Sequence, residues 1–576
     1  MWVVVGYTGA AMFLKFTQSK GRRYVQLVEA FRDETGHPRQ RTVATLGRLD
    51  EDGGTIDAML SRLAQAKGRK LDGAAGAAPQ VQFESALALG DVWALDQLWR
   101  ELGFTQLDAV FRRARFTAPV ESAVRAMVFN RLCDADSKLG VLRWLKTVSM
   151  PGLNADDLTH QQLLRAMDAL MDQRDAVDAC VAGLLRPLID QDLSLVFYDL
   201  TTIRTEGLSE QAGDVRKFGM AKEGVVARQF MLGVVQTADG LPIYHEVFEG
   251  NQAEAPTLLP TLKTVLQRHS HIRRLVVVAD RGLLSLDNIE ELRAITLPDG
   301  RALEFILAVP GRRYGEFTDI LQPLHDQAKQ ARDETIDEVR WQGLRLVVAH
   351  NPHQAAEQTA RRRERIRELE ARAAQLAGKL DGQDAGVKSR GRKLSDGGAT
   401  ARFYHEVSES HLLRIVRVDL HSKEFTYTLD DEALARAELM DGKLLLVTNV
   451  GGMIPTDVVA NYKALADIER GFKILKSEIE IAPVFHRLPD RIRAHAMLCF
   501  IALILYRVMR SRLKLAGAEV SPERALEQLR AIQRHRVRIH AAAPIEGIST
   551  IDAQQADLYK ALHLSKPTHD AQMTLL

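Results

Sequence analysis

Residues 193–200 read LSLVFYDL, a short apolar run with an aspartate, Asp199, near its end. Apolar runs of this length are typical of strands that are buried on both faces of a sheet. Two further runs have the same character: RRLVVVAD at residues 273–280, which ends at Asp280, and EFILAVP at residues 304–310. These three segments are therefore predicted to be core strands.

The sequence between these runs predicts a hairpin and two helices. Residues 229–236 and 241–248 flank the pair Asp239 and Gly240, and an Asp-Gly pair between two strands is a strong hairpin signal. Apolar residues at helical spacing predict helices over residues 255–269 and 287–294. The predicted order is strand, strand, strand, helix, strand, helix, strand, and the fold class is α/β.

Asp199 and Asp280 both lie at the carboxyl ends of predicted core strands. A hard divalent cation such as Mg²⁺ prefers oxygen ligands that are held rigidly, as they are at the edge of a sheet. Aspartate is also common after strands as a turn former or a helix N-cap. The pair alone therefore leaves a purely structural role open.

A third acidic residue, Glu469, lies in a predicted helix over residues 456–478. Residues Leu465, Ile468, Phe472 and Leu475 have the spacing of a buried stripe, while Tyr462, Glu469 and Lys476 recur every seven residues. At about 100° per residue, steps of seven place these three side chains along one line beside the stripe. A solvated helix edge of mixed polarity would give the same spacing.

The three motifs together resemble those of DDE-type transposases of bacterial insertion sequences, in the branch that cuts and pastes through DNA hairpins. YDLTT at residues 198–202 is similar to the first acidic motif, VVADRG at 277–282 to the second, and YKALADIERGFKILK at 462–476 to the third. The third motif of that branch carries Tyr, Arg, Glu and Lys, but the Arg position here is Leu465. The phosphate contact of that arginine is then absent or supplied by a neighbour such as Lys463.

The resemblance extends from about residue 13 to residue 512. The stretches that carry it, besides the acidic motifs, are FTQSKGRRYVQLVEAFRDETGHPRQRTVATLGRLDE at 16–51, RLCDADSKLGVLRWL at 131–145, GLPIYHEVFEGNQAE at 240–254 and RIRAHAMLCFIALIL at 491–505. The resemblance implies an α/β fold with a ribonuclease-H-like catalytic core that is interrupted by a β-containing insertion domain and preceded by a small β unit and a helical domain.

Domain boundaries follow from this implied fold together with local patterns. Residues 13–49 alternate as a β-hairpin would, residues 85–187 have helical periodicity, and the insertion is predicted to hold a helix at 354–380, a loop at 382–400 and strands at 412–420 and 424–429, before a core strand at 443–449. The predicted parts are an upstream extension (1–11), a small N-terminal β unit (12–75), a helical DNA-binding domain (80–187), the catalytic core in two parts (188–311 and 441–515) around the insertion domain (312–440), and a C-terminal tail (516–576).

The resemblance also implies the chemistry. Asp199, Asp280 and Glu469 would be the catalytic residues and hold two Mg²⁺ ions, for which Mn²⁺ could substitute, and Tyr462, Lys476 and Lys463 would contact DNA phosphate. The implied protein is a transposase that binds the double-stranded ends of its insertion sequence, as a homodimer on DNA, and catalyses strand cleavage and strand transfer into target DNA. Two alternatives stay open: a ribonuclease-H-like nuclease that does not join strands, and a non-catalytic DNA-binding protein derived from a transposase.

Composition sets broad limits on the class of protein. Of 576 residues, 46% are hydrophobic and 26% are charged, which excludes a mainly disordered, collagen-like or disulfide-scaffold chain. The three cysteines form no CxxC pair, which favours a reducing compartment. The net charge is only +2, but residues 15–48 carry eight basic and three acidic residues, and residues 484–540 carry twelve and four. Such basic patches suit a polyanion.

The remaining features of the sequence concern the location of the protein and weaker candidate residues. No run reaches the roughly 18 uninterrupted apolar residues that span a membrane, and residues 494–506 are predicted to be a buried helix. Residues 1–11 lack a basic signal-peptide start, so a cytoplasmic protein is expected, with Met1 or Met12 as its start. The sequence contains no GxxxxGK[ST] loop, so a nucleotide cofactor is not expected. Weaker candidates are Lys222 and Arg228 for DNA, Trp341 for stacking on a flipped base, and four histidines expected to be structural: His245, His405, His486 and His495.

Overall fold

The structure is a computed structural model. It describes the backbone of residues 4–5, 11–19, 22–32, 37–48, 81–189, 194–220, 226–270, 272, 274–279, 286–297, 300–328, 331–386, 393–539 and 543–568. The chain divides into two compact units: residues 1–96, 143–157 and 524–576 form the first, and residues 97–142 and 158–523 form the second. The predicted catalytic motifs all belong to the second unit.

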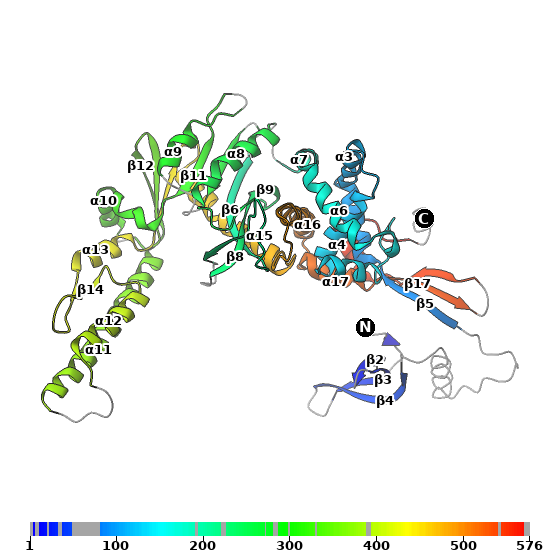
Figure 1. Cartoon of the computed structure of the whole chain (residues 1–576), viewed down its shortest axis with the longest axis horizontal. Helices are drawn as coiled ribbons and strands as arrows, with labels where there is room; N and C mark the ends of the chain where they lie inside the picture. The colour runs from blue at the N-terminus through cyan, green and yellow to red at the C-terminus, as the bar shows by residue number, and fades with distance from the viewer. Residues whose placement is uncertain are drawn as a thin grey trace. The chain divides into compact units, whose positions relative to one another are not determined.

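The first unit begins with a four-stranded antiparallel sheet, where the alternating sequence of residues 13–49 predicted a hairpin (Figure 1). Its strands are β1 (Val4–Val5), β2 (Ala11–Ser19), β3 (Arg22–Arg32) and β4 (Pro38–Arg48). Residues 1–11 were expected to lie outside the fold. That expectation is wrong for β1, because Val4 pairs with Phe13 and Val5 pairs with Met12.

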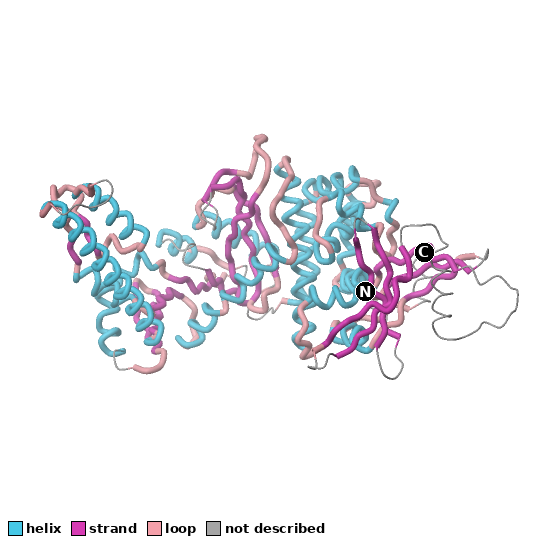
Figure 2. The backbone as a smooth tube through the Cα atoms, turned by 90° about the horizontal axis from the view of Figure 1, so that it is seen from below, coloured by secondary structure: helices cyan, strands magenta, loops and turns pink. Residues whose placement is uncertain are grey.

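A second sheet in the first unit joins segments that are far apart in the sequence, as the blue β5 beside the orange-red β17 shows in Figure 1; strands are magenta in Figure 2. Strand β5 (Val81–Ala88) pairs with β17 (Gln533–Ile539), which pairs with β18 (Ile545–Ile548), and helix α18 (Ala553–Ala561) follows. The helical reading of the chain from residue 80 is therefore wrong at β5, and the C-terminal segment is a folded part of this unit. The partner of β5 lies more than 400 residues away, so no local pattern reveals the pairing.

The second unit contains a helical part that is built around a long apolar helix, α16 (Pro489–Leu515). Helix α16 packs against α4 (Val120–Cys133) and α6 (His160–Asp172). It is the one helix in the described part of the chain that is long and apolar enough to cross a membrane, yet 94% of its most apolar window is buried inside the protein. The prediction of a buried helix over residues 494–506 is confirmed. The other helices of this part are α2 (Gly90–Glu101), whose start lies in the first unit, α3 (Leu107–Arg113), α5 (Lys138–Leu145), whose end lies in the first unit, and α7 (Arg174–Leu185). Most of α17 (Pro522–Arg530) belongs to the first unit.

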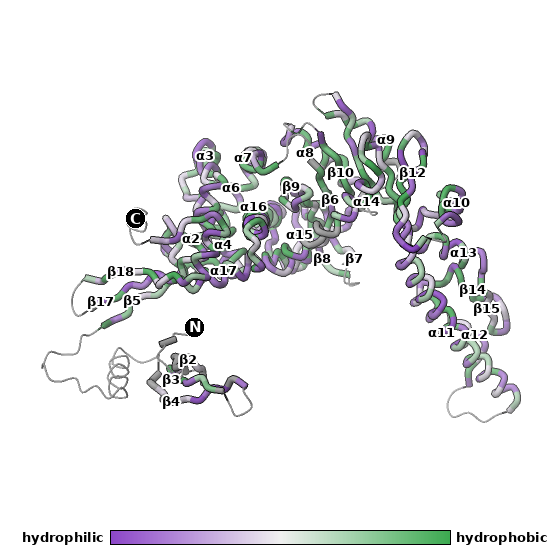
Figure 3. The backbone as a smooth tube through the Cα atoms, turned by 180° about the vertical axis from the view of Figure 1, so that it is seen from behind, coloured by the Kyte–Doolittle hydropathy of each residue, from purple (hydrophilic) through white to green (hydrophobic). Residues whose placement is uncertain are grey.

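The centre of the second unit is a mixed sheet. Its five core strands are β6 (Ser194–Arg204), β8 (Val226–Thr237), β9 (Pro242–Glu249), β10 (Leu275–Ala279) and β11 (Glu304–Ala308), in the spatial order β9, β8, β6, β10, β11. β6, β10 and β11 are parallel, and the β6–β8 and β8–β9 pairs are antiparallel. This order and these directions fit a ribonuclease-H-like core, and the predicted hairpin at Asp239 and Gly240 is confirmed. The centre of the sheet is hydrophobic in Figure 3.

Three more strands extend this sheet beyond β11. They are β16 (Lys443–Thr448), β13 (Leu344–His350) and β12 (Thr335–Trp341), each antiparallel to its neighbour. The short strand β7 (Lys217–Met220) pairs with the start of β8. The predicted core strand at 443–449 is thus confirmed, and the first two strands of the predicted insertion continue the core sheet instead of forming a separate one.

The rest of the predicted insertion is mainly helical. Helix α11 (Pro352–Asp384) packs on α12 (Asp396–Glu409) around a small core of its own, and α13 (Asp431–Met440) leads back to β16. The two predicted strands shrink to β14 (Val416–Val418) and β15 (Tyr427–Leu429), because Asp419 accepts hydrogen bonds from the backbone of His421 and Ser422 and starts a turn. The predicted loop at 382–400 is shorter, since Ser395 caps α12.

Helices cover both faces of the core sheet. On one face, α8 (Ala255–Arg268) is followed by β10 and then by α9 (Leu286–Arg293), close to the predicted helix positions. On the other face, the helix predicted over residues 456–478 is two helices, α14 (Pro455–Lys463) and α15 (Leu465–Ser477). Helix α14 packs against β10 and β11, whereas α15 packs against β6. Ala464 is the one residue between the two helices.

Candidate active site

Asp199 lies on β6 and faces the α14 and α15 side of the sheet. Phe197, two residues earlier, belongs to the buried cluster that includes Leu465 of α15. Tyr198 points the other way, and its hydroxyl donates to Thr257 Oγ1 of α8 at 2.8 Å. Because side chains alternate along a strand, Asp199 shares the face of Phe197. Its side chain is half-buried, and Asp199 Oδ1 accepts the backbone N–H of Leu200 at 2.7 Å.

Asp280, the second predicted acid, lies outside the described residues. The strand that precedes it in sequence is described up to Ala279, which is the register partner of Tyr198 in the parallel β6–β10 pair. Tyr198 is followed by Asp199, and Ala279 is followed by Asp280. The described strands therefore run side by side, in register, to the residue before each aspartate.

Glu469, the third predicted acid, lies in α15, and its side chain is outside the described part of the chain. Helix α15 packs against β6, and three members of the predicted stripe are buried in it: Leu465, Phe472 and Leu475. The helix also approaches β8 closely at Gly471, where a Cβ atom would lie 2.8 Å from Nε2 of the buried Gln236. The backbone that carries Glu469 is thus fixed on the same face of the sheet as Asp199.

The remaining residues of the third motif differ from the prediction in one respect. Tyr462 is in α14, so the boundary at Ala464 places it in a different helix from Glu469 and Lys476. The side chain of Glu469 lies outside the described part of the chain, so the single line of three side chains stays a prediction. Lys476 is exposed in the last turn of α15. Leu465, at the arginine position of the motif, is only 6% exposed and packs in the core.

Lys463 and Tyr462 line a cavity of about 400 Å³ with Tyr314 and Lys443. The Lys463 ammonium donates to both carboxylate oxygens of Glu334, at 2.7 and 2.8 Å. Tyr462 is partly buried against the core cluster. Lys463 is therefore already neutralised by an acidic partner, whereas Lys476 lies on the same helix as Glu469.

The weaker candidates for DNA contact are less suited to it. Arg228 is buried, and its guanidinium pairs with Asp214 at 3.1 Å and donates to the carbonyls of Gly207 and Ser209, so it holds the segment before β7. Lys222 lies outside the described residues. Trp341 ends β12 and packs against Phe317 with ring centroids 5.2 Å apart.

Two of the four histidines that were expected to be structural differ in their surroundings. His245 is buried and stacks on Phe500 with ring centroids 4.5 Å apart, and burial lowers its pKa to about 3. His405 is exposed near Glu409. Among the described side chains, no group of three or more His, Cys, Asp and Glu residues could hold a metal ion. The predicted metal ligands Asp280 and Glu469 have no described side chain, so their arrangement stays a prediction.

Sequence reasoning missed one cluster of basic residues. Arg131, Lys138 and Arg487 line a cavity of about 690 Å³ together with His486 and His495. Arg131 and Lys138 belong to the stretch RLCDADSKLGVLRWL, which resembles the transposases but was given no role. No helical spacing relates the two residues, because Arg131 lies in the last turn of α4 and Lys138 begins α5, and only the fold reveals that both are buried.

Two protein-family models match this chain. The model of the IS1634 family transposase N-terminal domain matches residues 14–77, and the model of the transposase DDE domain matches residues 190–505. The second match covers more than half of the chain, from β6 to α16, and includes all three acidic motifs. No curated protein matches the chain significantly.

Proposed function

This chain belongs to the insertion-sequence transposases with a DDE domain, and from that premise we propose that it excises its own element by cut-and-paste transposition. As a member of that family it binds DNA and is a metal-dependent enzyme of phosphoryl transfer on DNA. The proposal adds that it recognises the inverted-repeat ends, cleaves them through hairpin intermediates, and joins them to target DNA. It also adds a homodimer on DNA, because two ends must be held together, and a cytoplasmic location.

One observation carries the proposal. β6 and β10 are parallel and in register up to Tyr198 and Ala279, and α15 packs on the face of β6 to which Asp199 belongs. The three acidic motifs are thus borne by elements that are neighbours in the sheet and on one of its faces. This supports Asp199, Asp280 and Glu469 as one catalytic set.

The donor set suits a hard cation. Three carboxylates offer only oxygen ligands, which Mg²⁺ and Mn²⁺ prefer over softer metals. Two such ions, when bound, supply Lewis-acid activation of the attacking hydroxyl and stabilisation of the leaving oxygen. The chain's own contribution is to hold the three carboxylates on rigid elements and the DNA strand beside them.

Lys476 is the best candidate to hold that strand. It lies two turns after Glu469 on α15, a rise of about 10 Å, and its ammonium would act as a point charge on a phosphate near the cleaved one. Tyr462 and Lys463 come from α14, and Lys463 first has to leave Glu334. We therefore propose a main phosphate contact for Lys476 and lesser ones for the other two.

The test uses the full-length protein, Mg²⁺ and a plasmid that carries the gene with its natural flanking DNA. Hairpin-ended element fragments and joined products are the expected result. End-specific cleavage without joined product would support a ribonuclease-H-like nuclease instead. Binding to the ends without cleavage, in Mg²⁺ or Mn²⁺, would support a non-catalytic DNA-binding protein, which Leu465 at the arginine position keeps as the second candidate.

A further inference from the structure

The cavity of about 690 Å³ is enclosed by α4, α5, the start of α6 and of α16, and the segment of residues 479–488 that follows α15. We refer to it as the basic pocket. All of its lining residues belong to the second unit. Four cationic side chains and two carboxylates line it, which leaves an excess of two positive charges when the histidines are neutral.

Lys138 is the most unusual residue of the basic pocket. Its side chain is only 7% exposed, and its ammonium makes no hydrogen bond or ion pair with any other residue that the structure describes. Lysine is almost never this buried without a partner, because removing an ammonium from water is costly. Burial and the nearby Arg131 charge lower the pKa of Lys138 to about 8.

Two arginines add to the positive charge at this place. Arg131 donates to the carbonyls of Ile479 and Glu480, at 3.5 and 3.2 Å, so it anchors the segment 479–488 through acceptors that carry no formal charge. Arg487 is exposed at the rim and has no partner among the described residues. Arg491, by contrast, is neutralised by Asp168 through hydrogen bonds of 2.7 and 2.8 Å.

The neighbouring groups do not cancel this charge. Of the two carboxylates, Glu480 is exposed, and Asp136 Oδ1 accepts the N–H of Ser137. Burial, followed by the charges of Lys138 and Arg131, lowers the pKa of both imidazoles, His486 to about 3 and His495 well below its ordinary value. Both rings are therefore neutral at physiological pH. Phe485, 70% exposed, completes the rim.

The basic pocket is tied to the proposed catalytic strand. Val484 N donates to Arg204 O at 3.1 Å, and Glu206 N donates to Val484 O at 2.9 Å, so the segment 479–488 lies beside the end of β6. Five residues of extended strand separate Asp199 from Arg204, roughly 17 Å. One strand of duplex carries a phosphate every 3.4 Å along the axis. A duplex whose strand is cleaved at Asp199 can thus place a phosphate about five base pairs away at the pocket.

We propose that the basic pocket binds one phosphate of the DNA strand, with Lys138 and Arg487 as its ligands and Phe485 against the adjoining nucleotide. A buried ammonium without a partner destabilises the free protein. The ammonium of Lys138 gains a phosphate as its charged partner when DNA binds, and this accounts for a buried lysine at this position. Exposed aromatic rings beside cations are the usual contact surface for nucleotides. The proposal rests on the proposed function, since it assigns the DNA to the same reaction.

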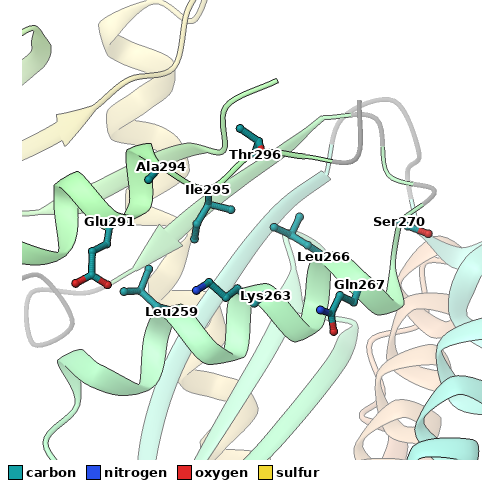
Figure 4. Close-up of a pocket in the computed structure, with 9 residues that line it drawn as sticks. All are labelled: Leu259, Lys263, Leu266, Gln267, Ser270, Glu291, Ala294, Ile295 and Thr296. Carbon is teal, nitrogen blue, oxygen red and sulfur yellow. The ribbon is translucent and has the colours of Figure 1, made fainter. Parts of the chain in front are cut away.

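A second cavity of the second unit can be compared with the basic pocket. A cavity of about 560 Å³ between α8 and α9 is lined by Lys263, Glu291 and mainly apolar side chains (Figure 4). One cation and one carboxylate leave it without excess charge, and Lys263 is exposed. Nothing there favours an anion, so Lys263 serves as the matched control.

The test compares Lys138→Met, which keeps the apolar stem but loses the ammonium, with Arg487→Ala and Lys263→Ala. Affinity for element-end duplex is measured over a range of salt concentrations in an Asp199→Asn background, which removes cleavage. We expect Lys138→Met to weaken binding about tenfold and to reduce the salt slope by about one, with Tm unchanged or higher. Arg487→Ala should weaken binding in the same direction, and Lys263→Ala should change it less than twofold.

The site on the DNA is located by ethylating single phosphates. Ethylation at one position within about one helical turn, roughly 10 base pairs, of the cleaved bond should weaken binding by wild type and leave Lys138→Met unaffected. Inorganic phosphate at millimolar concentration should not compete with DNA, because competition would assign the pocket to a free anion. Wild-type affinity of Lys138→Met, or weaker binding together with a lower Tm, would overturn the proposal. If these effects on binding appear but the protein with Asp199 intact does not cleave element ends, the proposed function fails and the proposed phosphate site stands.

Discussion

Ala279, the last described residue of β10, is the register partner of Tyr198 on β6, and the two strands are parallel. Each of the two residues directly precedes an aspartate of the predicted catalytic set. The register is fixed by apolar side chains on both faces, since every residue of β10 is buried. A slip of one residue would move every side chain of β10 to the opposite face, where it would no longer fit the side chains packed there, so the relative position of the two strand ends is specified.

The catalytic set predicts a sharp separation of cleavage from binding. Asp199→Asn, Asp280→Asn and Glu469→Gln each replace a charged oxygen ligand by an amide of the same shape. Each should slow single-turnover cleavage by about a thousandfold or more, about 4 kcal/mol, with end binding within a few fold of wild type. Glu478→Gln is the control, because Glu478 is an exposed acid just after α15. Cleavage at near wild-type rate by any one of the three would remove that residue from the set.

The two lysines of the third motif should differ in effect. Lys476 is exposed at the end of α15, whereas the Lys463 ammonium is held by Glu334. Lys476→Ala should therefore slow cleavage at least tenfold, about 1.4 kcal/mol, while Lys463→Ala and Tyr462→Phe should each cost less than threefold. Single-turnover rates at saturating protein measure this. Equal losses for Lys463→Ala and Lys476→Ala would mean that Lys463 leaves Glu334 to bind DNA.

Leu465 should not be convertible into the arginine of the related motif. It is 6% exposed and packs with Val458 and Val459. Leu465→Arg would bury a guanidinium without a partner, which costs several kcal/mol, and should lower Tm without raising the cleavage rate. Leu465→Met, which keeps the volume, should cost less than about 1.5 kcal/mol. A faster and equally stable Leu465→Arg protein would show that the side chain can reach solvent.

Local patterns predicted the core well and long-range pairing poorly. The apolar runs at β6, β10 and β11 identify buried strands because few other structures hide every side chain of a short run. The Asp-Gly pair identifies the β8–β9 turn because Gly240 adopts a positive φ of 77°. β5 was not predicted because its partner β17 is remote in sequence, and the helix boundary at Ala464 was not predicted because the apolar spacing continues through it.

The candidate site was predictable in part for a related reason. The core strands are predictable from their apolar runs, so the acidic residues that follow them can also be identified from the sequence. The basic pocket could not be read, because the burial of Lys138 depends on how α4, α5 and α16 meet, and no single one of these helices encodes it.

The pairing of β5 with β17 predicts that the C-terminal segment stabilises the fold. In the first unit, Tyr559 donates to Gly90 O at 2.9 Å and Trp93 Nε1 donates to Ser565 O at 3.0 Å. Deleting residues 516–576 would expose one edge of β5 and would remove the hydrogen-bond partners of Gly90 O and Trp93 Nε1. We expect Tm to fall by about 5 °C or more and protease sensitivity to rise around residues 81–96. Deletion of residues 569–576 alone, the control, should change neither, and an unchanged Tm in the long deletion would contradict the pairing.

Because the ammonium of Lys138 is buried, we predict that the free energy of unfolding rises with pH while the affinity for DNA falls. The groups around it are Arg131 on α4, Asp136 before α5, His486 and Arg487 in the segment 479–488, and His495 and Cys499 on α16. Its pKa is about 8 in the folded protein and about 10.5 in the unfolded chain. Below pH 8 both states hold the proton, and the cost of the buried ammonium is fully present. Between about pH 8 and 10.5 the unfolded chain binds more protons, so the free energy of unfolding rises with pH.

DNA affinity should fall over the same range, because Lys138 loses the charge that we propose it offers to a phosphate. Wild type and Lys138→Met are compared at pH 7 and pH 9 at constant salt, by urea unfolding and by fluorescence anisotropy with an end duplex. Relative to the variant, wild type should gain stability and lose affinity as pH rises, and the two affinities should converge at pH 9. Parallel pH curves for the two proteins would mean that the Lys138 ammonium does not titrate in this range, and that its charge is not what the pocket offers to DNA.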